Sequence, residues 1–376
     1  HFETLHPVGI DMGLSRVARV WQRLCNHYSI NQLATKKVIT VSGTNGKGST
    51  CQMLFLLLQE KNNRIGVYTS PHIHHFSERV QINGLSVTDE QLIQAFTAIE
   101  TLRREISLSY FEATTLVGLL IFAWEKVDYA ILEVGLGGRL DAINIIDADA
   151  TILTSVGLDH ANFLGTDLSQ IAVEKAGIFR TDKPAIYGEQ TVYQSVINYN
   201  KTYKLPKKLN DWGKHQLQNA TSVVILLAQL NLLPNDYQSR LEQFSLAGRL
   251  QVIGHNPKII VDVAHNTDAA IALADYIRSQ HHNGKIFAVI GMLKDKDHKA
   301  VLSVFDGLFD HIYFGGTLGE RGFDSKELQT IYQQVSNTDN HIDSSSYPTL
   351  TEALNQAKTD ASNTDVIYAF GSFLVV

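Results

Sequence analysis

The sequence predicts an α/β protein of two domains: a larger N-terminal domain with a parallel sheet and helices on both of its faces, and a smaller C-terminal domain. The 376 residues are too many for one ordinary hydrophobic core. Short apolar runs alternate with helix-like segments in both halves, which indicates parallel strands joined by helices. This alternation fades over Gln190–Gly213 and resumes after Gly248. We therefore predict domains at residues 1–246 and 247–376.

In the N-terminal half, the expected strands are short apolar runs without polar alternation. Runs of this kind are typical of strands buried on both faces of a sheet. They lie at Val38–Val41, Arg64–Tyr68, Tyr129–Val134 and Thr151–Val156. Helices are expected between and after them, at Thr50–Glu60, Gln91–Arg103, Glu112–Lys126 and Gln216–Leu230.

The C-terminal half repeats the alternation on a smaller scale, which predicts a Rossmann-like domain. Its expected strands are Ile259–Val263, Ile286–Ile290, Ile312–Phe314 and Val366–Phe370. Its expected helices are Asp268–Arg278, Lys299–Phe305, Ser325–Gln334 and Thr351–Lys358.

Charge and composition exclude several classes of protein. The formal net charge of −6 offers no basic face to nucleic acid, and no apolar run approaches the ~20 residues of a membrane span. Neither nucleic acid nor a membrane is therefore an expected partner. The two cysteines, Cys25 and Cys51, stand far apart, which favours the reducing cytoplasm over a disulfide scaffold. The chain begins at His1 and stops in the apolar run Phe373–Val376, so we expect both ends to be truncated.

The segment from Gly43 to Ser49, between an expected strand and an expected helix, predicts a phosphate-binding loop. Its glycines let backbone N–H groups face one concavity, and the helix N-terminus adds positive potential. Lys47 can reach a β- or γ-phosphate, and the hydroxyl of Ser49 or Thr50 can ligate Mg²⁺. Gly48 separates the lysine from the hydroxyl, unlike the common P-loop pattern. We expect ATP to contact Thr44, Asn45, Gly46, Lys47, Gly48 and Ser49.

Polar residues lie at the end of three more of the expected strands or shortly after it. They are Ser70, Glu133 and His160. The carboxyl ends of parallel strands meet at one edge of a sheet, where open α/β sheets bind their ligands. A metal-bound nucleotide needs further oxygen or imidazole ligands, so we interpret these residues as metal ligands. Each of them alone fits a helix cap or a turn equally well.

Longer motifs identify the chain as similar to the folylpolyglutamate synthase family, a branch of the Mur ligases. They occur in family order over almost the whole chain, and they include Gly43–Ser49, Tyr68–Gly84, Tyr110–Thr115, Glu133–Asn144, Gly157–Gly165, Val173–Ile178, Asp262–Asn266 and Gly291–Asp297. The resemblance is greatest to the bifunctional bacterial members, which make dihydrofolate and also extend folates. Ile143 in place of Thr, Thr267 in place of Pro, and a short stretch between Gly188 and Asn219 depart from the family pattern.

The resemblance implies one ATP and two Mg²⁺ ions. It assigns Ser70, Glu133, His160 and Lys175 as metal ligands, with Lys175 carbamylated. A carbamate converts a cation into an oxygen ligand, and its formation needs a neutral amine with a depressed pKa. An unmodified Lys175 in an ion pair is the alternative. Asn219, Arg249 and Asp262 are the further ATP contacts. The implied catalytic residues are Lys47, His160, Lys175 and His265.

By the same resemblance, the substrates are dihydropteroate, folates and L-glutamate, joined through an acyl phosphate by a monomeric enzyme. The expected substrate contacts are Asp11, Met12, Gly13, Ser109, Tyr110, Phe111, Glu112, Leu140, Asp141 and Ala142. Tyr110 and Phe111 suit a flat pterin, although core residues would look the same. A monofunctional folylpolyglutamate synthase, another Mur-type peptide ligase, a kinase and a non-catalytic nucleotide-binding regulator remain as alternatives.

Overall fold

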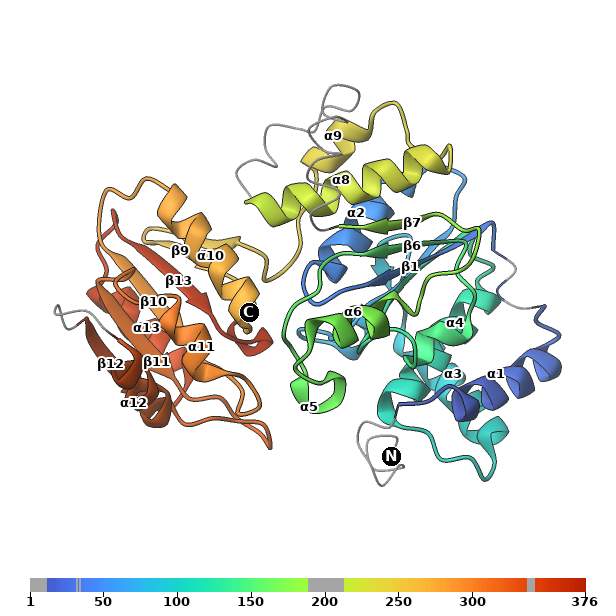
Figure 1. Ribbon diagram of the computed structural model, residues 1–376, viewed down its shortest axis with the longest axis horizontal. Coiled ribbons are helices and arrows are strands. Elements are labelled where there is room, and N and C mark those ends of the chain that lie inside the picture. Colours follow the sequence, from blue (N-terminus) through green and yellow to red (C-terminus); the bar gives the residue numbers. More distant parts are fainter. Residues whose placement is uncertain (1–11, 32, 34, 189–212, 337–341) are drawn as a thin grey trace. The chain divides into compact units, whose positions relative to one another are not determined.

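The computed structural model describes residues 12–31, 33, 35–188, 213–336 and 342–376. They form two compact units, and the main boundary lies between Phe244 and Ser245. The sequence places this boundary two residues later, after residue 246. Each unit contains one sheet with helices on both faces (Figure 1).

The first unit contains a seven-stranded sheet in the order β4-β3-β2-β5-β1-β6-β7. Its strands are β1 (Lys37–Ser42), β2 (Ile65–Tyr68), β3 (Val80–Ile82), β4 (Leu85–Ser86), β5 (Tyr129–Glu133), β6 (Ala150–Leu153) and β7 (Ala185–Tyr187). The neighbours from β2 to β7 pair in parallel, as expected. The burial of every residue of β2, β5 and β6 confirms that these apolar runs lie inside a covered sheet.

The antiparallel hairpin β3–β4 extends the predicted parallel sheet by two short strands. Asn83 and Gly84 form its two-residue turn, with φ angles of 51° and 80°. Positive φ at both central residues is the requirement of the tightest hairpin turn, which Asn-Gly meets best. The Asn83-Gly84 dipeptide therefore predicts this hairpin, but a search for apolar runs does not detect it.

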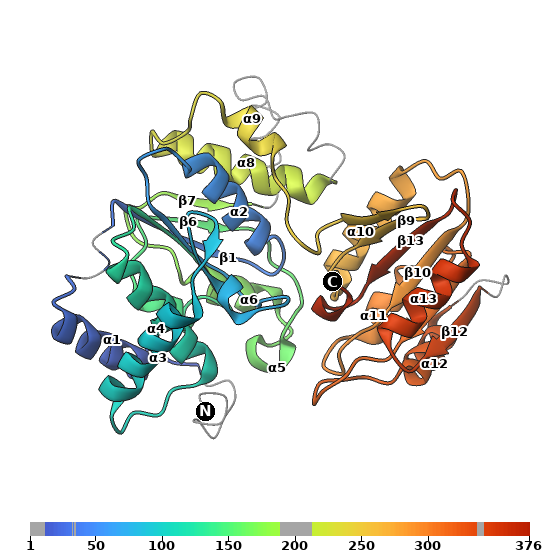
Figure 2. The same cartoon turned by 180° about the vertical axis from the view of Figure 1, so that it is seen from behind.

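Two helical layers cover this sheet (Figure 1 and Figure 2). One contains α2 (Lys47–Leu58), α8 (Lys214–Gln229) and α9 (Tyr237–Glu242), and the other contains α1 (Ser15–Tyr28), α3 (Asp89–Arg103) and α4 (Tyr110–Trp124). The short helices α5 (Ala161–Leu164), α6 (Leu168–Ala176), η1 (Phe76–Arg79) and η2 (Ala142–Ile145) follow strands of the same sheet.

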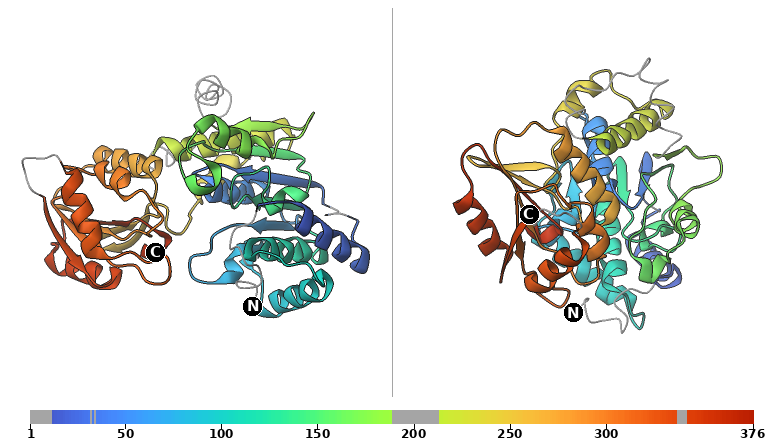
Figure 3. Two further views of the ribbon diagram at one scale, coloured as in Figure 1. Left: turned by 60° about the horizontal axis from the view of Figure 1, so that its bottom comes forward. Right: turned by 60° about the vertical axis from the view of Figure 1, so that its left-hand side comes forward.

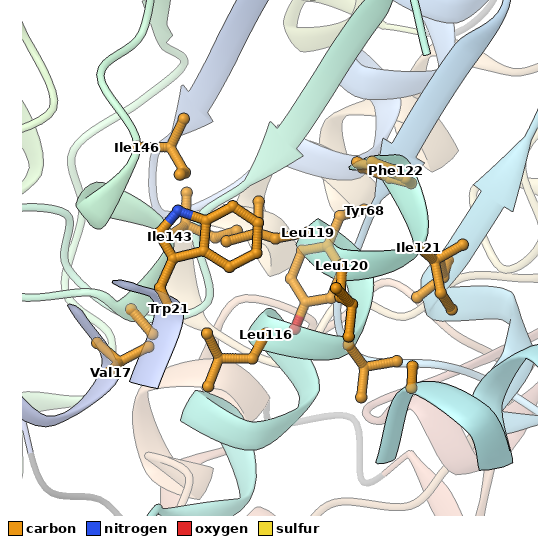
Figure 4. Packing of buried hydrophobic residues seen from close by; sticks show 14 of the residues in the cluster. Val17, Trp21, Tyr68, Leu116, Leu119, Leu120, Ile121, Phe122, Ile143 and Ile146 are labelled. Carbon is orange, nitrogen blue, oxygen red and sulfur yellow. The ribbon is translucent and has the colours of Figure 1, made fainter. Parts of the chain in front are cut away.

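The main core of the first unit lies under the layer of α1, α3 and α4. Figure 4 shows Val17 and Trp21 of α1 beside Leu116 of α4 and Ile143 of η2. Val17, Val20, Trp21 and Leu24 are all buried. This i, i+3, i+4, i+7 spacing is the period of an amphipathic helix, although the sequence analysis assigned no helix to the segment.

The second unit contains a six-stranded sheet in the order β12-β11-β10-β13-β9-β8. Its strands are β8 (Gln251–His255), β9 (Lys258–Val261), β10 (Ile286–Ile290), β11 (His311–Gly315), β12 (Asp343–Tyr347) and β13 (Val366–Phe370). Only the edge strand β8 pairs antiparallel in this described sheet. The edge strands β8 and β12 were not expected, because neither is a continuous apolar run.

Helices cover both faces of the second sheet (Figure 3). One face packs on α13 (Leu350–Asp360), and the other packs on α10 (Thr267–Ser279), α11 (His298–Ser303) and α12 (Ser325–Val335). The chain then ends in η4 (Phe373–Val375). Among the described helices of both units, none has the length and apolar character that a membrane crossing requires.

Candidate active site

The predicted phosphate loop lies at the carboxyl end of β1. The strand ends at Ser42, and α2 begins at Lys47. Between them, Gly43 and Gly46 have φ angles of 149° and 85°, and a Cβ atom on Gly43 would lie 1.8 Å from Thr154 Oγ1. Glycine is therefore required here by both conformation and space. The loop enters a helix N-terminus, where N–H groups and positive potential favour a phosphate.

The segment after β6 holds the loop in place. Thr44 N–H donates to Ser155 O at 2.9 Å, and Asn45 N–H donates to Ser155 Oγ at 3.0 Å. Thr44 Oγ1 donates to Gly157 O at 3.1 Å and accepts from Gly157 N–H at 2.9 Å. The N–H groups of Thr44 and Asn45 already have protein partners, so the first turn of α2 is the better place for phosphate oxygens.

Lys47 lies over the loop that precedes it. Its Nζ atom donates to Gly43 O at 2.9 Å and to Thr44 O at 3.1 Å. These contacts hold a positive charge beside the helix N-terminus, where a phosphate-binding lysine would lie.

The hydroxyls after Lys47 lie inside the protein. Ser49 Oγ accepts a hydrogen bond from Gln216 Nε2 at 3.1 Å, and Gln216 Oε1 accepts one from Asn219 Nδ2 at 3.1 Å. The Oγ1 atom of Thr50 is buried and has no hydrogen-bond partner in the described part of the chain. Gln216 is thus a contact of the loop that the sequence analysis missed. A glutamine 167 residues away carries no sequence signal for this role.

Ser70 and Glu133 meet at the same edge of the sheet. Ser70 follows β2 and Glu133 ends β5, and these two strands are parallel neighbours. The Ser70 N–H group donates to Glu133 Oε2 at 3.1 Å, and Glu133 is only 4% exposed. β5 also pairs with β1, with Glu133 opposite Val41. The structure therefore brings these two predicted metal ligands together beside the phosphate loop.

His160 adopts an uncommon backbone conformation, with a φ angle of 52°. Its N–H group donates to Asp159 Oδ1 at 2.8 Å, and its ring is 40% exposed. A non-glycine residue with positive φ is often found at functional sites. The local geometry is consistent with a ligand role, and it identifies Asp159 as the group that holds the backbone here.

Lys175 lies in the last turn of α6 and is only 5% exposed. Burial and, to a smaller extent, the positive charge of Lys47 lower the pKa of its ammonium to about 7. Asp159 and Asp141 act in the opposite direction. Lys175 is therefore within electrostatic reach of the phosphate loop, and a substantial share of its amine is neutral near neutral pH. That is the state that carbamate formation needs.

The predicted metal ligands fit Mg²⁺ only if oxygen donors other than Asp and Glu side chains complete the site. The described residues contain no group of three His, Cys, Asp or Glu side chains that could hold a metal. Glu133 and Ser70 supply hard oxygen donors, the type that Mg²⁺ prefers. A carbamate on Lys175 and the phosphate oxygens of a nucleotide would complete such a set. The residues present therefore fit a nucleotide-bound Mg²⁺ rather than a protein-only metal site.

Asp141 organises the turn after β5. Its carboxylate accepts hydrogen bonds from the N–H groups of Gly135, Leu136 and Ile143, at 3.0, 2.9 and 3.0 Å. Burial nevertheless raises the pKa of Asp141 to about 6, against the effect of these bonds and of Lys47. In this structure the Asp141 carboxylate is hydrogen-bonded to the backbone of its own loop.

The predicted substrate residues of α4 also support the fold. Ser109 and Glu112 form a capping box, because Glu112 N–H donates to Ser109 Oγ at 3.3 Å and Ser109 N–H donates to Glu112 Oε2 at 2.7 Å. Tyr110 lies 5.5 Å from the guanidinium of Arg79. The Phe111 ring packs against Gly135, where a Cβ atom would lie 2.4 Å from it. Ala142, in η2, is buried.

A cavity of about 610 Å³ lies beside the turn after β5. It is lined by Met12, Arg139, Leu140, Phe163, Leu164, Ser169, Gln170, Val173 and Glu174. Met12 and Leu140 are predicted substrate contacts that the fold brings together, whereas Tyr110, Phe111 and Asp141 do not line it. Phe163 and Val173 were not predicted, although both are exposed apolar residues. Gly13 follows Met12 in the described chain, and Asp11 lies outside the described residues.

In the second unit, the predicted ATP contact Arg249 and the predicted catalytic residue His265 lie near one aromatic ring. The ring of His265 lies 5.6 Å from that of Phe373, and the Arg249 guanidinium lies 5.9 Å from it. His265 Nδ1 is hydrogen-bonded to Val263 O at 2.7 Å. Asp262 accepts from Leu250 N–H at 2.9 Å and from Ala264 N–H at 2.8 Å. These residues follow or flank β9 and β13, at the carboxyl edge of the sheet.

Comparison with known proteins places this geometry in a family. Residues 41–204 match the Mur ligase middle domain, and residues 248–373 match the Mur ligase glutamate ligase domain. The Escherichia coli dihydrofolate synthase/folylpolyglutamate synthase is 36% identical over 403 residues, which cover 100% of this chain and 92% of that protein. The chain belongs to the folylpolyglutamate synthase family of Mur ligases.

Other members of this Mur ligase family agree over the same length. The Haemophilus influenzae dihydrofolate synthase/folylpolyglutamate synthase is 34% identical and covers 100% of this chain and 94% of its own. A structure of Escherichia coli FolC in complex with DHPP and ADP has a TM-score of 0.87 at 33% identity, covering 100% and 94% of the two chains. A bifunctional folylpolyglutamate synthase/dihydrofolate synthase with Mn, AMPPNP and L-glutamate bound has a TM-score of 0.86 at 36% identity, with the same coverage.

Proposed function

We propose that this chain is an ATP-dependent ligase that adds L-glutamate to dihydropteroate and to folates. One observation carries the proposal. The phosphate loop with Lys47, the Ser70–Glu133 pair and the buried Lys175 belong to one unit, in a chain that matches bifunctional dihydrofolate and folylpolyglutamate synthases along its length. A protein that only binds nucleotide would need the loop without the buried lysine.

The reaction would proceed in two steps. A carboxylate oxygen of the pteroate or folate attacks the γ-phosphorus of ATP, which gives an acyl phosphate and releases ADP. The amine of L-glutamate then attacks the acyl carbon, an amide bond forms, and phosphate and a proton leave. Lys47 would stabilise the charge on the transferring phosphoryl group, and the loop would fix its orientation.

Ser70, Glu133, His160 and Lys175 would hold Mg²⁺, which supplies charge neutralisation at the phosphates. For Lys175 to serve as an oxygen ligand, its neutral amine must add to CO₂, so that an N–C bond forms and one proton is released to solvent. The buried position and the pKa of about 7 support that step.

The substrates would divide between the two units. We assign the pteroate or folate to the cavity of the first unit, at Met12 and Leu140. We also propose Asp11, Gly13, Asp141, Ala142 and residues 109–112 as substrate contacts, although the described residues among them do not line this cavity. Thr44–Ser49 and Asn219 of the first unit would contact ATP. Arg249, Asp262 and His265 of the second unit would contact it as well, with His265 at the γ-phosphate. We further propose that the enzyme acts as a monomer in the cytoplasm.

The decisive experiment offers dihydropteroate and tetrahydrofolate separately, with ATP, Mg²⁺ and L-glutamate, and measures phosphate release and each amide product. Glutamate-dependent phosphate release with both acceptors is expected. Product from tetrahydrofolate alone would establish a monofunctional folylpolyglutamate synthase. Phosphoryl transfer without glutamate-dependent phosphate release would establish a kinase and refute the proposal.

A further inference from the structure

The two polypeptide segments that carry Glu133 and Lys175 are joined by a dense set of contacts. Glu133 ends β5, and the turn Gly137–Arg139 follows a few residues later. Lys175 lies in the last turn of α6, next to Glu174. The turn and the end of this helix pack directly on each other, so the distance between the two predicted ligands depends on this junction.

Backbone contacts form the first part of the junction. The Arg139 N–H group donates to Glu174 O at 2.8 Å. A Cβ atom on Gly138 would lie 2.6 Å from Lys175 O, and one on Gly177 would lie 2.3 Å from Arg139 Cβ. Glycine at both positions lets the turn approach the helix end more closely than any side chain would permit.

Side chains form the second part. Arg139 Nε and Nη2 donate to Glu174 Oε1 at 3.1 and 2.7 Å. Asn144 Nδ2 donates to Arg139 O at 3.0 Å and to Gly177 O at 3.1 Å, so one amide bridges the two segments. Arg180 Nη2 in turn donates to Asn144 Oδ1 at 2.9 Å. The junction is thus fixed from both of its sides.

We propose that the Arg139–Glu174 ion pair is a positioning device that fixes Lys175 relative to Glu133 for carbamate formation and metal binding. The inference rests on the proposed function, because that function assigns the two ligands. The pair is half exposed, with side-chain exposures of 51% and 24%. Such a pair adds little to global stability, so its main effect is local: it keeps the end of α6 on the turn.

Arg139 and Glu174 also line the cavity that we assign to the substrate. A direct contact with substrate would therefore be the competing explanation for any loss of activity. The two explanations differ in a measurable way. A substrate contact affects the KM for pteroate and leaves the metal site unchanged, whereas a positioning role affects Lys175 and the metal in the absence of any pteroate.

The chain offers a matched control in the same unit. Arg64 and Glu125 also form an ion pair, with side-chain exposures of 48% and 23%. Arg64 precedes β2, and Glu125 lies between α4 and β5. This pair therefore lies at the amino ends of the strands, whereas the junction with Lys175 follows the carboxyl end of β5. Removing this pair removes the same charges and a similarly exposed contact, without touching the junction.

The experiment compares the variants Arg139→Gln, Glu174→Gln and Arg64→Gln in the full chain, without pteroate. Carbamate on Lys175 is followed by NMR with ¹³C-bicarbonate, and Mn²⁺ binding in the presence of ADP is followed by electron paramagnetic resonance. Arg139→Gln and Glu174→Gln are expected to lose most of the carbamate signal. They are also expected to bind Mn²⁺ about 10-fold or more weakly, which is the usual effect of removing a residue that orients a metal ligand. Arg64→Gln is expected to match the wild type.

Two further variants separate positioning from folding. Arg139→Lys keeps a charge that reaches Glu174 and should restore part of both signals, and the exchange Arg139→Glu/Glu174→Arg should restore more than either single change. Melting temperatures of Arg139→Gln and Arg64→Gln should fall equally. Unchanged carbamate and Mn²⁺ binding in Arg139→Gln would overturn the inference, as would equal losses in Arg64→Gln. A wild-type chain that ligates glutamate without a carbamate signal would also overturn it, while the proposed function would stand.

Discussion

At the scale of single residues, the buried Lys175 combines a functional assignment with a cost in stability. Its pKa of about 7 lies below the ordinary lysine value of 10.5, because burial and Lys47 disfavour the charged form. Between these two pH values the unfolded chain binds more protons than the folded one, so stability rises with pH across this window. Below about pH 7 the full penalty for burying the ammonium is present.

Replacing this lysine should therefore stabilise the protein while it abolishes ligation. Lys175→Met, measured by denaturant unfolding in CO₂-free buffer at pH 6, is expected to raise the free energy of unfolding by on the order of 2–4 kcal/mol. The gain should shrink as the pH rises from about 7 toward 10.5, because the folded wild-type amine is neutral across this window while the unfolded amine is still protonated. Lys61→Met removes an exposed lysine and is the control. A Lys175→Met variant less stable than wild type at pH 6 would show that the ammonium is well paired.

Residue contacts across the site were only partly predictable. Lys47 and Glu133 stand in motifs whose chemistry can be read directly from residue type and position after a strand. Gln216 and Asp159 have no such signal, because their roles come from the contacts that the fold creates. Gln216 reaches Ser49 from another helix, and Asp159 acts through the backbone of His160. A single sequence contains neither contact.

At the scale of elements, the apolar runs predicted the central strands well, because β5, β10 and β13 are buried on both faces. The same criterion failed where a strand has an exposed face or edge. β12 is Asp-Ser-Ser-Ser-Tyr at the edge of its sheet, and its pairing with β11 comes from backbone hydrogen bonds rather than side-chain burial. Helix α1 was missed for another reason. Its buried residues recur with the period of a helix, but polar residues stand between them, so the segment contains no continuous apolar run.

Helix α1 makes a testable contribution to the first unit. Trp21 is 7% exposed and packs in the core with α4. Trp21→Ala is expected to destabilise the first unit by roughly 3–5 kcal/mol, because a large cavity replaces the ring. Ile93 of α3 is 65% exposed, so Ile93→Ala should change stability by about 0.5 kcal/mol or less. Urea unfolding followed by circular dichroism measures both, and equal effects would show that α1 is not part of the cooperative core.

At the scale of the whole molecule, the proposal assigns one nucleotide to residues of both units. The first unit provides the phosphate loop, with Lys47 at its centre. The second provides Arg249 and His265 near Phe373, and Asp262 directly after β9 at the carboxyl edge of its own sheet. ADP lacks the γ-phosphate, so the two units should differ in how strongly they discriminate ATP from ADP.

His265 is the residue on which that discrimination should depend. Its Nδ1 atom is engaged with Val263 O at 2.7 Å, so a contact with the γ-phosphate would use Nε2. A hydrogen bond to a charged group contributes about 1.5–3 kcal/mol, so His265→Ala should weaken binding of a non-hydrolysable ATP analogue by roughly 10- to 100-fold and leave ADP binding nearly unchanged. Lys47→Ala should weaken both nucleotides, and His255→Ala, an exposed histidine of β8, should weaken neither. Calorimetric titration of each variant with both nucleotides decides the matter. Equal losses for ADP and the analogue in His265→Ala would remove His265 from the γ-phosphate and place it on the part of the nucleotide that the two ligands share.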